Sequence, residues 1–177
     1  MKRQHVIAAA LTAVILIADL ITKSWALRAL GDGRRIELLG GWVPLTLAFN
    51  RGAAFGLSIG DDPRWVFIPI TVLAVGFLLV LIIRAGPGQH LQSLAAALVL
   101  GGALGNLYDR VRWDQGVVDF IGPINLGFMH WPIFNVADMG ITVGAILLAI
   151  HFWREEAEYR RADDANSEPE LDRVDQR

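Results

Sequence analysis

The sequence predicts an all-α integral membrane protein: four transmembrane helices with a small extracytoplasmic β-sheet in the first long loop. Two observations lead to this fold class. The chain of 177 residues is 54% hydrophobic and only 19% charged, with a mean hydropathy of +0.42, an apolar excess that is rare in soluble domains. Its apolar residues also gather into separate runs of about 17–25 residues, long enough to cross about 30 Å of hydrocarbon.

These runs define one four-span membrane domain, residues 1–154, followed by a polar cytoplasmic tail, residues 155–177. The spans are expected at about residues 6–30, 65–84, 91–109 and 133–153. A soluble helical core is the alternative, but helices that are apolar all round need lipid or a larger protein around them. The first run could also be a cleaved signal peptide, yet Asp19 and Lys23 interrupt it where a small-residue cleavage site should follow, which favours a retained span.

Four spans place both chain ends on one side of the membrane, with the two long connections, 31–64 and 108–132, on the other. Lysine and arginine are too evenly spread for the positive-inside rule to decide the orientation, but the opening MKR favours cytoplasmic termini. Within the first connection, RIELL and WVPLTLAF alternate and are rich in β-branched and aromatic residues, which predicts the sheet. The few apolar residues of 155–177 predict a disordered or frayed tail.

Charged side chains inside the predicted spans need a physical reason, because burying them in hydrocarbon is costly. Asp19 and Lys23 are four residues apart on one helical face, in the order that favours an ion pair. They either neutralise each other as a structural pair or position a substrate or a neighbouring loop.

The stretch GGALGNLYDR, residues 101–110, forms a second polar cluster. Its glycines leave room for another helix to approach closely. Asn106 and Arg110 are four residues apart, and Asp109 is three from Asn106, so all of them can face one side at the outer end of the third span. A hydrogen-bond network that only closes the helix end is the alternative reading.

Two further acids bracket the second long connection. Asp119 lies in VVDFI, an apolar pattern typical of an extended segment at the membrane interface, and Asp138 follows Asn135 at the start of the fourth span. Asn135 suits a helix N-cap, and Asp138 could merely complement the helix dipole. Brought together in a poorly hydrated site, however, the two carboxylates would share one proton and supply an acid and a base. That pair can hydrolyse an amide without a covalent intermediate.

Other chemistries fit the sequence less well. It has no cysteine, its serines lack a plausible histidine and acid partner, and its four histidines are scattered without an H-E-x-x-H helix, so we expect neither a metal nor a cofactor. A net charge of −2 gives no reason to expect nucleic acid. A small transporter, supported by the intramembrane Asp19 and Lys23, and a non-enzymatic scaffold, supported by the glycine-rich third span, remain as alternatives.

The motifs DLITK, FNRGAAFG, GGALGNLYDR, VVDFI and FNVADMGI, which extend over about 70% of the chain, together resemble the lipoprotein signal peptidase (signal peptidase II) family. The resemblance implies an aspartic endopeptidase of the bacterial inner membrane that removes signal peptides from prolipoproteins. It would cut at the outer face, on the amino side of a diacylglyceryl-modified cysteine. Its partners would be the lipid-modified prolipoprotein and membrane lipids, and the cyclic peptide globomycin would inhibit it.

The resemblance also assigns residues. The family's catalytic aspartates fall on Asp119 and Asp138. Its supporting polar residues fall on Asp19, Lys23, Asn50, Gly52, Asn106, Arg110 and Asn135. From its place near a helix start, we expect Asp138 to be the more readily ionised of the two acids, and Asp119 to hold the shared proton.

Overall fold

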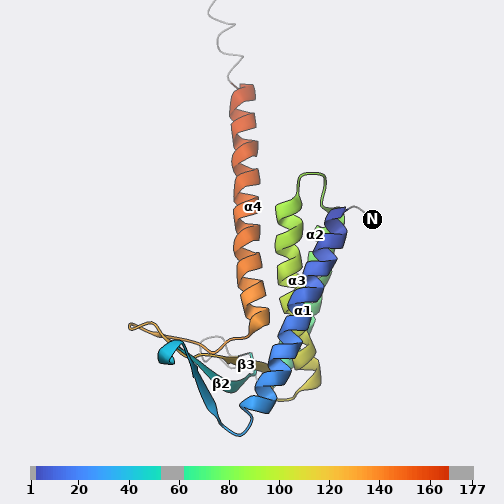
Figure 1. The fold of residues 1–177 in the computed structure, drawn as a ribbon. Helices are drawn as coiled ribbons and strands as arrows, with labels where there is room; N and C mark the ends of the chain where they lie inside the picture. The colour runs from blue at the N-terminus through green and yellow to red at the C-terminus, as the bar shows by residue number, and fades with distance from the viewer. Residues whose placement is uncertain (1–2, 53–61, 168–177) are drawn as a thin grey trace, which may run out of the picture.

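The computed structural model describes residues 3–52 and 62–167. Four long helices dominate it: α1 (Arg3–Ala29), α2 (Arg64–Arg84), α3 (His90–Arg112) and α4 (Val136–Ser167). Each is long and apolar enough to cross a membrane, so the predicted four-span fold class is confirmed. The start of α1 and the far end of α4 lie on one side of the bundle, and the sheet lies across the opposite end (Figure 1).

Helix α3 is the centre of the bundle and packs against the other three helices. Its glycines make this possible, as the sequence predicts. A side chain at Gly101 would overlap Ile15 and Thr12 of α1, and one at Gly102 would overlap the backbone of Ala137 in α4. Small residues let the helix backbones approach closely, which is how packing is achieved where lipid supplies no hydrophobic drive.

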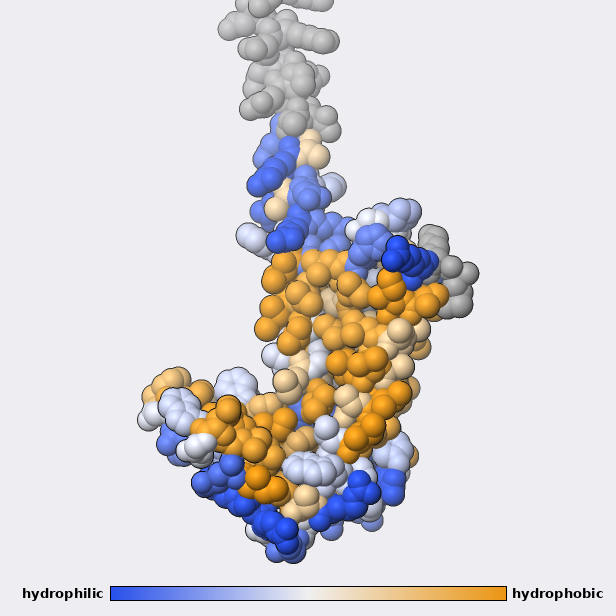
Figure 2. Space-filling model, viewed as in Figure 1, coloured by the Kyte–Doolittle hydropathy of each residue, from blue (hydrophilic) through white to orange (hydrophobic). Residues whose placement is uncertain are grey.

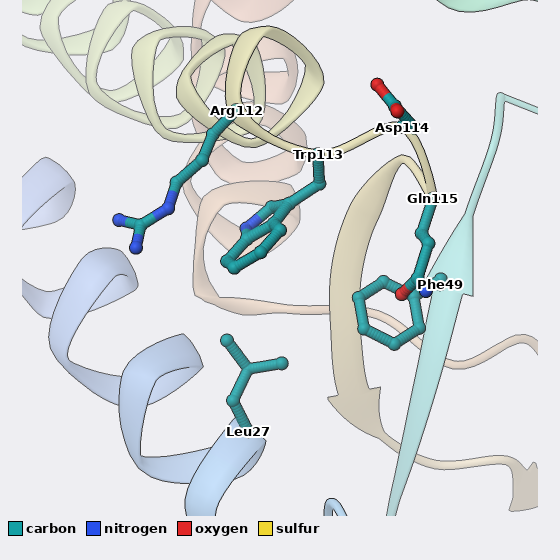
Figure 3. Close-up of a pocket in the computed structure, with 6 residues that line it drawn as sticks. All are labelled: Leu27, Phe49, Arg112, Trp113, Asp114 and Gln115. Carbon is teal, nitrogen blue, oxygen red and sulfur yellow. The ribbon is translucent and has the colours of Figure 1, made fainter.

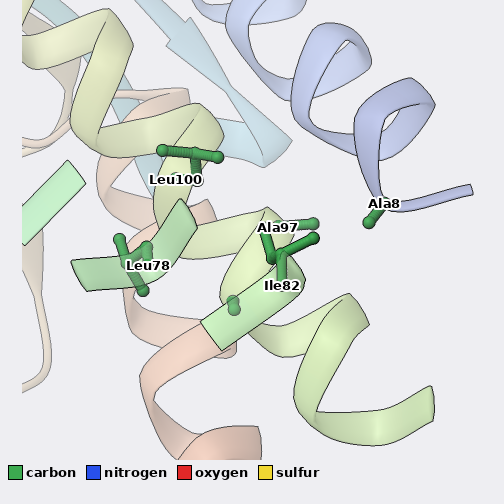
Figure 4. Close-up of a cluster of buried hydrophobic side chains, with 6 residues drawn as sticks. Ala8, Leu78, Ile82, Ala97 and Leu100 are labelled. Atoms are coloured by element: carbon green, nitrogen blue, oxygen red, sulfur yellow. The ribbon is translucent and has the colours of Figure 1, made fainter. Parts of the chain in front are cut away.

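A cluster of buried apolar side chains fills the end of the bundle remote from the sheet. It joins α1, α2 and α3 through Ala8, Leu78, Ile82, Ala96, Ala97 and Leu100 (Figure 4). Outside this cluster many large apolar side chains point outward, including Val14 and Leu73, which are 60% and 75% exposed. On the face seen in Figure 2, apolar side chains form a broad band along the helices. A band of that size indicates a surface that contacts lipid chains.

The sheet has three antiparallel strands in the order β1 (Arg35–Leu38), β2 (Val43–Asn50) and β3 (Val117–Ile121). The small sheet expected in the first long loop is therefore present, but its third strand, VVDFI, comes from the second connection. The small elements η1 (Leu39–Gly41), β4 (Ile124–Asn125) and β5 (His130–Trp131) complete this end of the molecule. A second apolar cluster, which includes Ala26, Leu30, Leu45 and Phe120, fixes the sheet to the end of α1.

The last helix differs from the expected span at both ends. It begins at Val136 rather than 133, because Phe134 still bridges to Ile121 of β3. It also continues to Ser167, so the expectation of a disordered or frayed tail is wrong for residues 155–167. A membrane helix that is already formed needs no new nucleus to extend, and the ion pair Glu156–Arg160 supports the extension at i,i+4 spacing.

The arrangement predicts a two-sided topology. Reporter fusions placed after Gly88 and after Glu155 should report one side of the membrane, and fusions after Asp32 and Gln115 should report the other. Paired phosphatase and fluorescent-protein fusions measure this directly. The same signal from Gly88 and Gln115 would contradict four spans.

Candidate functional site

A buried ammonium group organises the polar end of the bundle. Lys23 Nζ lies 2.7 Å from Asp19 Oδ2 and 2.9 Å from Asp109 Oδ2. It also donates a 2.9 Å hydrogen bond to Asn106 Oδ1. An ammonium has three protons to donate, and these three acceptors match that capacity. Lys23 is only 2% exposed and Asp19 is fully buried, so the pair expected from the sequence exists and joins α1 to α3.

Asp19 additionally fixes the start of α4. Its Oδ1 accepts a 2.9 Å hydrogen bond from the backbone N–H of Ala137, one of the donors that the first turn of a helix leaves free. The contact requires Gly105 on α3, since a side chain there would overlap the Asp19 carboxylate. The choice left open by the sequence is thus resolved in part, because the pair positions a neighbouring segment as well as neutralising itself.

Asn135 caps α4 and reaches both acids. Its Oδ1 accepts the backbone N–H of Asp138 at 2.9 Å, and its own N–H donates to Asp138 Oδ2 at 3.2 Å. This reciprocal arrangement is a capping box. The Nδ2 group of Asn135 meanwhile donates to Asp119 Oδ1 at 2.7 Å. One fully buried asparagine therefore holds the carboxylates of β3 and α4 next to each other.

Asn106 links this pair to the buried lysine. Its Nδ2 donates to Asp138 Oδ1 at 2.8 Å, and its Oδ1 accepts from Asn135 Nδ2 at 3.1 Å in addition to Lys23. Hydrogen bonds therefore run without a break from Lys23 through Asn106 to Asp138, and through Asn135 to Asp119. Networks of this kind fix side chains in one arrangement when every member is satisfied.

Asp119 is the more deeply placed of the two acids. It lies on β3 opposite Ala48 of β2 and is 2% exposed. Asp109 of α3 fixes the strand in place, because its Oδ2 accepts the N–H of Val118 at 3.1 Å. Burial, and then the nearby charge of Asp138, raise the pKa of Asp119 from its ordinary value of 3.8 to about 7, and hydrogen bonds from Asn50 and Asn135 offset this rise only in part.

Arg110 and Gly52 meet at the ring of Phe67. The guanidinium of Arg110 lies 5.2 Å from the centre of that ring, and a side chain at Gly52, where φ is +103°, would overlap the ring. Gly52 also donates its N–H to Asn50 Oδ1 at 2.8 Å. Within the described ranges, 3–52 and 62–167, the buried Nε of Arg110 has no hydrogen-bond partner. The second half of the motif FNRGAAFG, residues 53–56, lies outside the described residues.

A cavity of about 340 Å³ borders this network between α2, α3 and α4. Its polar lining residues are Thr71, whose hydroxyl donates to the backbone of Phe67, and Asn106, Arg110 and Asp138. The apolar wall includes Ile70, Leu78, Val99 and Ile141. Asp138 is half-buried and faces this space, so it is the acid that a molecule in the cavity would meet first.

The structure brings every singled-out residue to the sheet end of the bundle, in one connected neighbourhood. The sequence placed Asp109 in the polar cluster at the end of the third span without assigning it a function, and it gave Phe67 no role. Asp109 carries a signal, since it is a buried acid in the GNLYDR motif, but its partners Lys23 and Val118 are not visible from its neighbours in the chain. Phe67 looks like any apolar residue of a membrane helix, and nothing in the sequence distinguishes it.

A multi-pass membrane protein with two adjacent carboxylates, one of them buried, is of the class that can carry out acid–base hydrolysis at a membrane surface. Comparison with known proteins identifies the particular family. The sequence profile described as signal peptidase (SPase) II matches residues 11–154. The chain belongs to the signal peptidase II family, and it is a peptidase of bacterial membranes.

Similar proteins support the assignment. The lipoprotein signal peptidase of Ectopseudomonas mendocina is 40% identical over 86% of this chain and 90% of its own length. That of Halothermothrix orenii is 36% identical over 81% and 92%. A bacterial membrane enzyme solved by the in meso method at 2.3 Å resolution superposes with a TM-score of 0.73 at 30% identity, covering 85% of this chain and 90% of the other.

The ion cluster predicts that replacing the buried Lys23 lowers stability far more than replacing the exposed Arg34. Lys23→Met leaves Asp19 and Asp109 buried without their counter-ion, so the free energy of unfolding should fall by about 3–5 kcal/mol. Arg34→Gln breaks an exposed ion pair with Asp32 and should leave stability unchanged within error. Thermal unfolding of the detergent-purified variants, followed by circular dichroism, measures both. Equal stability of the two variants would show that the cluster does not hold the bundle together.

Proposed function

We propose that this peptidase removes the signal peptide from prolipoproteins, cutting on the amino side of a diacylglyceryl-modified cysteine, with Asp119 and Asp138 as its catalytic pair. The observation that carries the proposal is the position of these acids. Asn135 holds them together, and Asp138 opens onto a cavity between membrane helices. Relatives that carry the name lipoprotein signal peptidase support the substrate class.

The cavity suits a substrate that stays in the membrane. Its walls are apolar on α2, α3 and α4 and polar only near the sheet, so a signal helix and acyl chains can lie against the apolar part. The scissile bond then reaches Asp138 at the end of the bundle without leaving the interface. A soluble protease site would instead require the substrate to be extracted into water, against the burial of its lipid.

The two acids divide the chemistry. Asp138 takes a proton from water, and the hydroxide formed adds to the carbonyl carbon of the scissile amide. Asp119 gives its proton to the carbonyl oxygen, which yields a tetrahedral diol. On collapse the carbon–nitrogen bond breaks, the leaving nitrogen takes the proton held by Asp138, and one diol hydroxyl returns its proton to Asp119 as the new carboxyl group forms. One water is consumed and both acids return to their starting state. The raised pKa of Asp119, about 7, supports its role as the proton donor.

The hydrogen bonds fit this division. Both oxygens of Asp138 accept N–H donors, from Asn106 and from the backbone of Asn135, and such bonds stabilise a carboxylate. Arg110 lines the cavity beside Asp138, and its Nε, which has no hydrogen-bond partner among the described residues, can donate to a substrate carbonyl. Asn50 orients Asp119, and Gly52 lets the chain pass close to Phe67.

Orientation follows from the substrate. A prolipoprotein is cleaved after its export, so we place the sheet and the acids at the outer face of the bacterial inner membrane and both termini in the cytoplasm. The basic start of the chain agrees with this placement. Membrane lipids then surround the apolar band, and globomycin would compete for the cavity between α2 and α4.

Replacing either acid should abolish cleavage. Asp119→Asn and Asp138→Asn should each lower the turnover rate by at least about 10²–10⁴-fold, because neither amide can exchange the proton that the reaction moves. The measurement is a gel-shift assay with a lipid-modified prolipoprotein and detergent-purified enzyme. Asp114→Asn is the matched control, since its side chain is 88% exposed and pairs only with Arg64 among the described residues. Near-normal turnover in either acid variant would remove the pair from the mechanism.

The state of the shared proton is a separate prediction. Because the folded enzyme raises the pKa of Asp119 to about 7, the proton donor is present below that pH and lost above it, so turnover should fall as pH rises beyond about 7. Infrared difference spectra near neutral pH should show a protonated-carboxyl band that Asp119→Asn removes and Asp138→Asn retains. Since coupled acids titrate as a pair, the spectra rather than the pH profile make the assignment, and the opposite pattern would reverse the two roles.

A further inference from the structure

A second cleft lies between α1 and α3, on a different helix pair from the cavity that borders Asp138. It has a volume of about 260 Å³. Residues from α1 that line it include Leu20, Ser24 and Leu27, and residues at the end of α3 include Tyr108, Arg112 and Trp113. A neighbouring pocket of about 290 Å³ shares Leu27, Arg112 and Trp113 with it (Figure 3), so the two form one continuous depression at the membrane surface.

Arg112 is held in place at the rim of this cleft. Its guanidinium lies 4.7 Å from the ring centre of Trp113 and 5.7 Å from that of Tyr108, and it donates a hydrogen bond to the Tyr108 hydroxyl. Stacking on two aromatic rings orients the guanidinium and leaves its remaining N–H donors free.

The charge of Arg112 has no counter-ion in the part of the chain that the structure describes. The nearby acids are engaged elsewhere, Asp109 with Lys23 and Asp114 with Arg64. The Arg112 side chain extends toward α1 and not toward Asp114 (Figure 3). An oriented, uncompensated arginine at the end of a membrane helix lies at the level of lipid headgroups, where its complement is a phosphate.

The rest of the cleft fits a lipid rather than a free anion. Leu20 and Leu27 are about two turns apart along α1 and line an apolar path beside the arginine, and Ser24 lies between them along the helix. Lys23 and Asp109 line the same cleft, so whatever fills it also covers the buried ion cluster from this side.

We propose that this cleft binds one phospholipid of the leaflet on the sheet side, with the headgroup phosphate on Arg112 and Ser24 and an acyl chain along Leu20 and Leu27. The bound lipid closes the path from the membrane surface to Lys23 and keeps water away from its ion pairs. The proposal does not depend on the chemistry of Asp119 and Asp138.

The test is lipid-dependent stability of the full chain in dodecyl maltoside, a detergent without phosphate. Titrated dioleoylphosphatidylglycerol should raise the unfolding temperature of the wild type to a plateau, as a ligand specific for the folded state does. Arg112→Gln should need at least about tenfold more lipid for half of the effect, the loss expected for a charge-assisted contact. Arg84→Gln, which removes an arginine from the last turn of α2, is the matched control and should titrate like the wild type.

Two further arms separate the sources of the effect. Dioleoylglycerol, which has the chains without the phosphate, and inorganic phosphate, which has no chains, should each leave the unfolding temperature unchanged. Leu27→Trp should fill the cleft and weaken the lipid effect while Arg112 is retained. An equal shift with inorganic phosphate, an equal shift with dioleoylglycerol, or an unaltered lipid titration in Arg112→Gln would each overturn the proposal.

Discussion

The ammonium group of Lys23 is the interaction on which the rest of the structure depends. A charge of this kind inside a membrane helix is unfavourable by several kcal/mol when alone, and here it is compensated by Asp19, Asp109 and Asn106. Two carboxylates around one ammonium leave an excess negative charge. The backbone offsets it, since Asp19 accepts an N–H from the start of α4 and Asp109 accepts one from β3. One ion cluster therefore fixes α1, α3, α4 and the sheet at a common point.

Two asparagines, rather than further charged residues, connect this ion cluster to Asp119 and Asp138. An amide donates and accepts at once, so Asn106 can accept from Lys23 and donate to Asp138, and Asn135 can accept from the backbone of Asp138 and donate to Asp119. An ionised side chain in either place could only donate or only accept, and one of the acids would lose its partner. Two neutral residues thus hold two ionisable ones close together without adding charge to a poorly hydrated site.

Those parts of the fold and of the candidate site that depend on residues close together in the chain could be predicted from the sequence. The spans follow from apolar runs, the Asp19–Lys23 pair from its spacing, and the Asn135 cap from its place before an apolar helix. What could not be predicted depends on segments far apart in the chain. The role of VVDFI as the third strand requires β2, which lies about 70 residues earlier. Likewise the packing of Phe67 on Gly52 and Arg110 has no trace in the neighbours of any of the three.

The prediction of a disordered or frayed tail is wrong at residues 155–167 for a different reason. A charged segment with few apolar residues has no apolar face to bury, which predicts disorder when the segment stands alone. A helix that continues from a membrane span avoids the nucleation step, so the segment remains helical.

The sequence allows two interpretations of Asp138, an acid at a helix start and a catalytic acid, and the geometry is compatible with both at once. The capping box with Asn135 gives Asp138 its position and one donor, Asn106 supplies a second donor, and the carboxylate also lines the cavity between α2, α3 and α4. Asp119 has the opposite environment, since β3 buries it under the sheet and the neighbouring charge opposes its ionisation. The environments of the two carboxylates thus differ because of where each is attached, and this difference supports the proposed division into acid and base. A helix start stabilises one negative charge, and a buried strand beside it then disfavours a second.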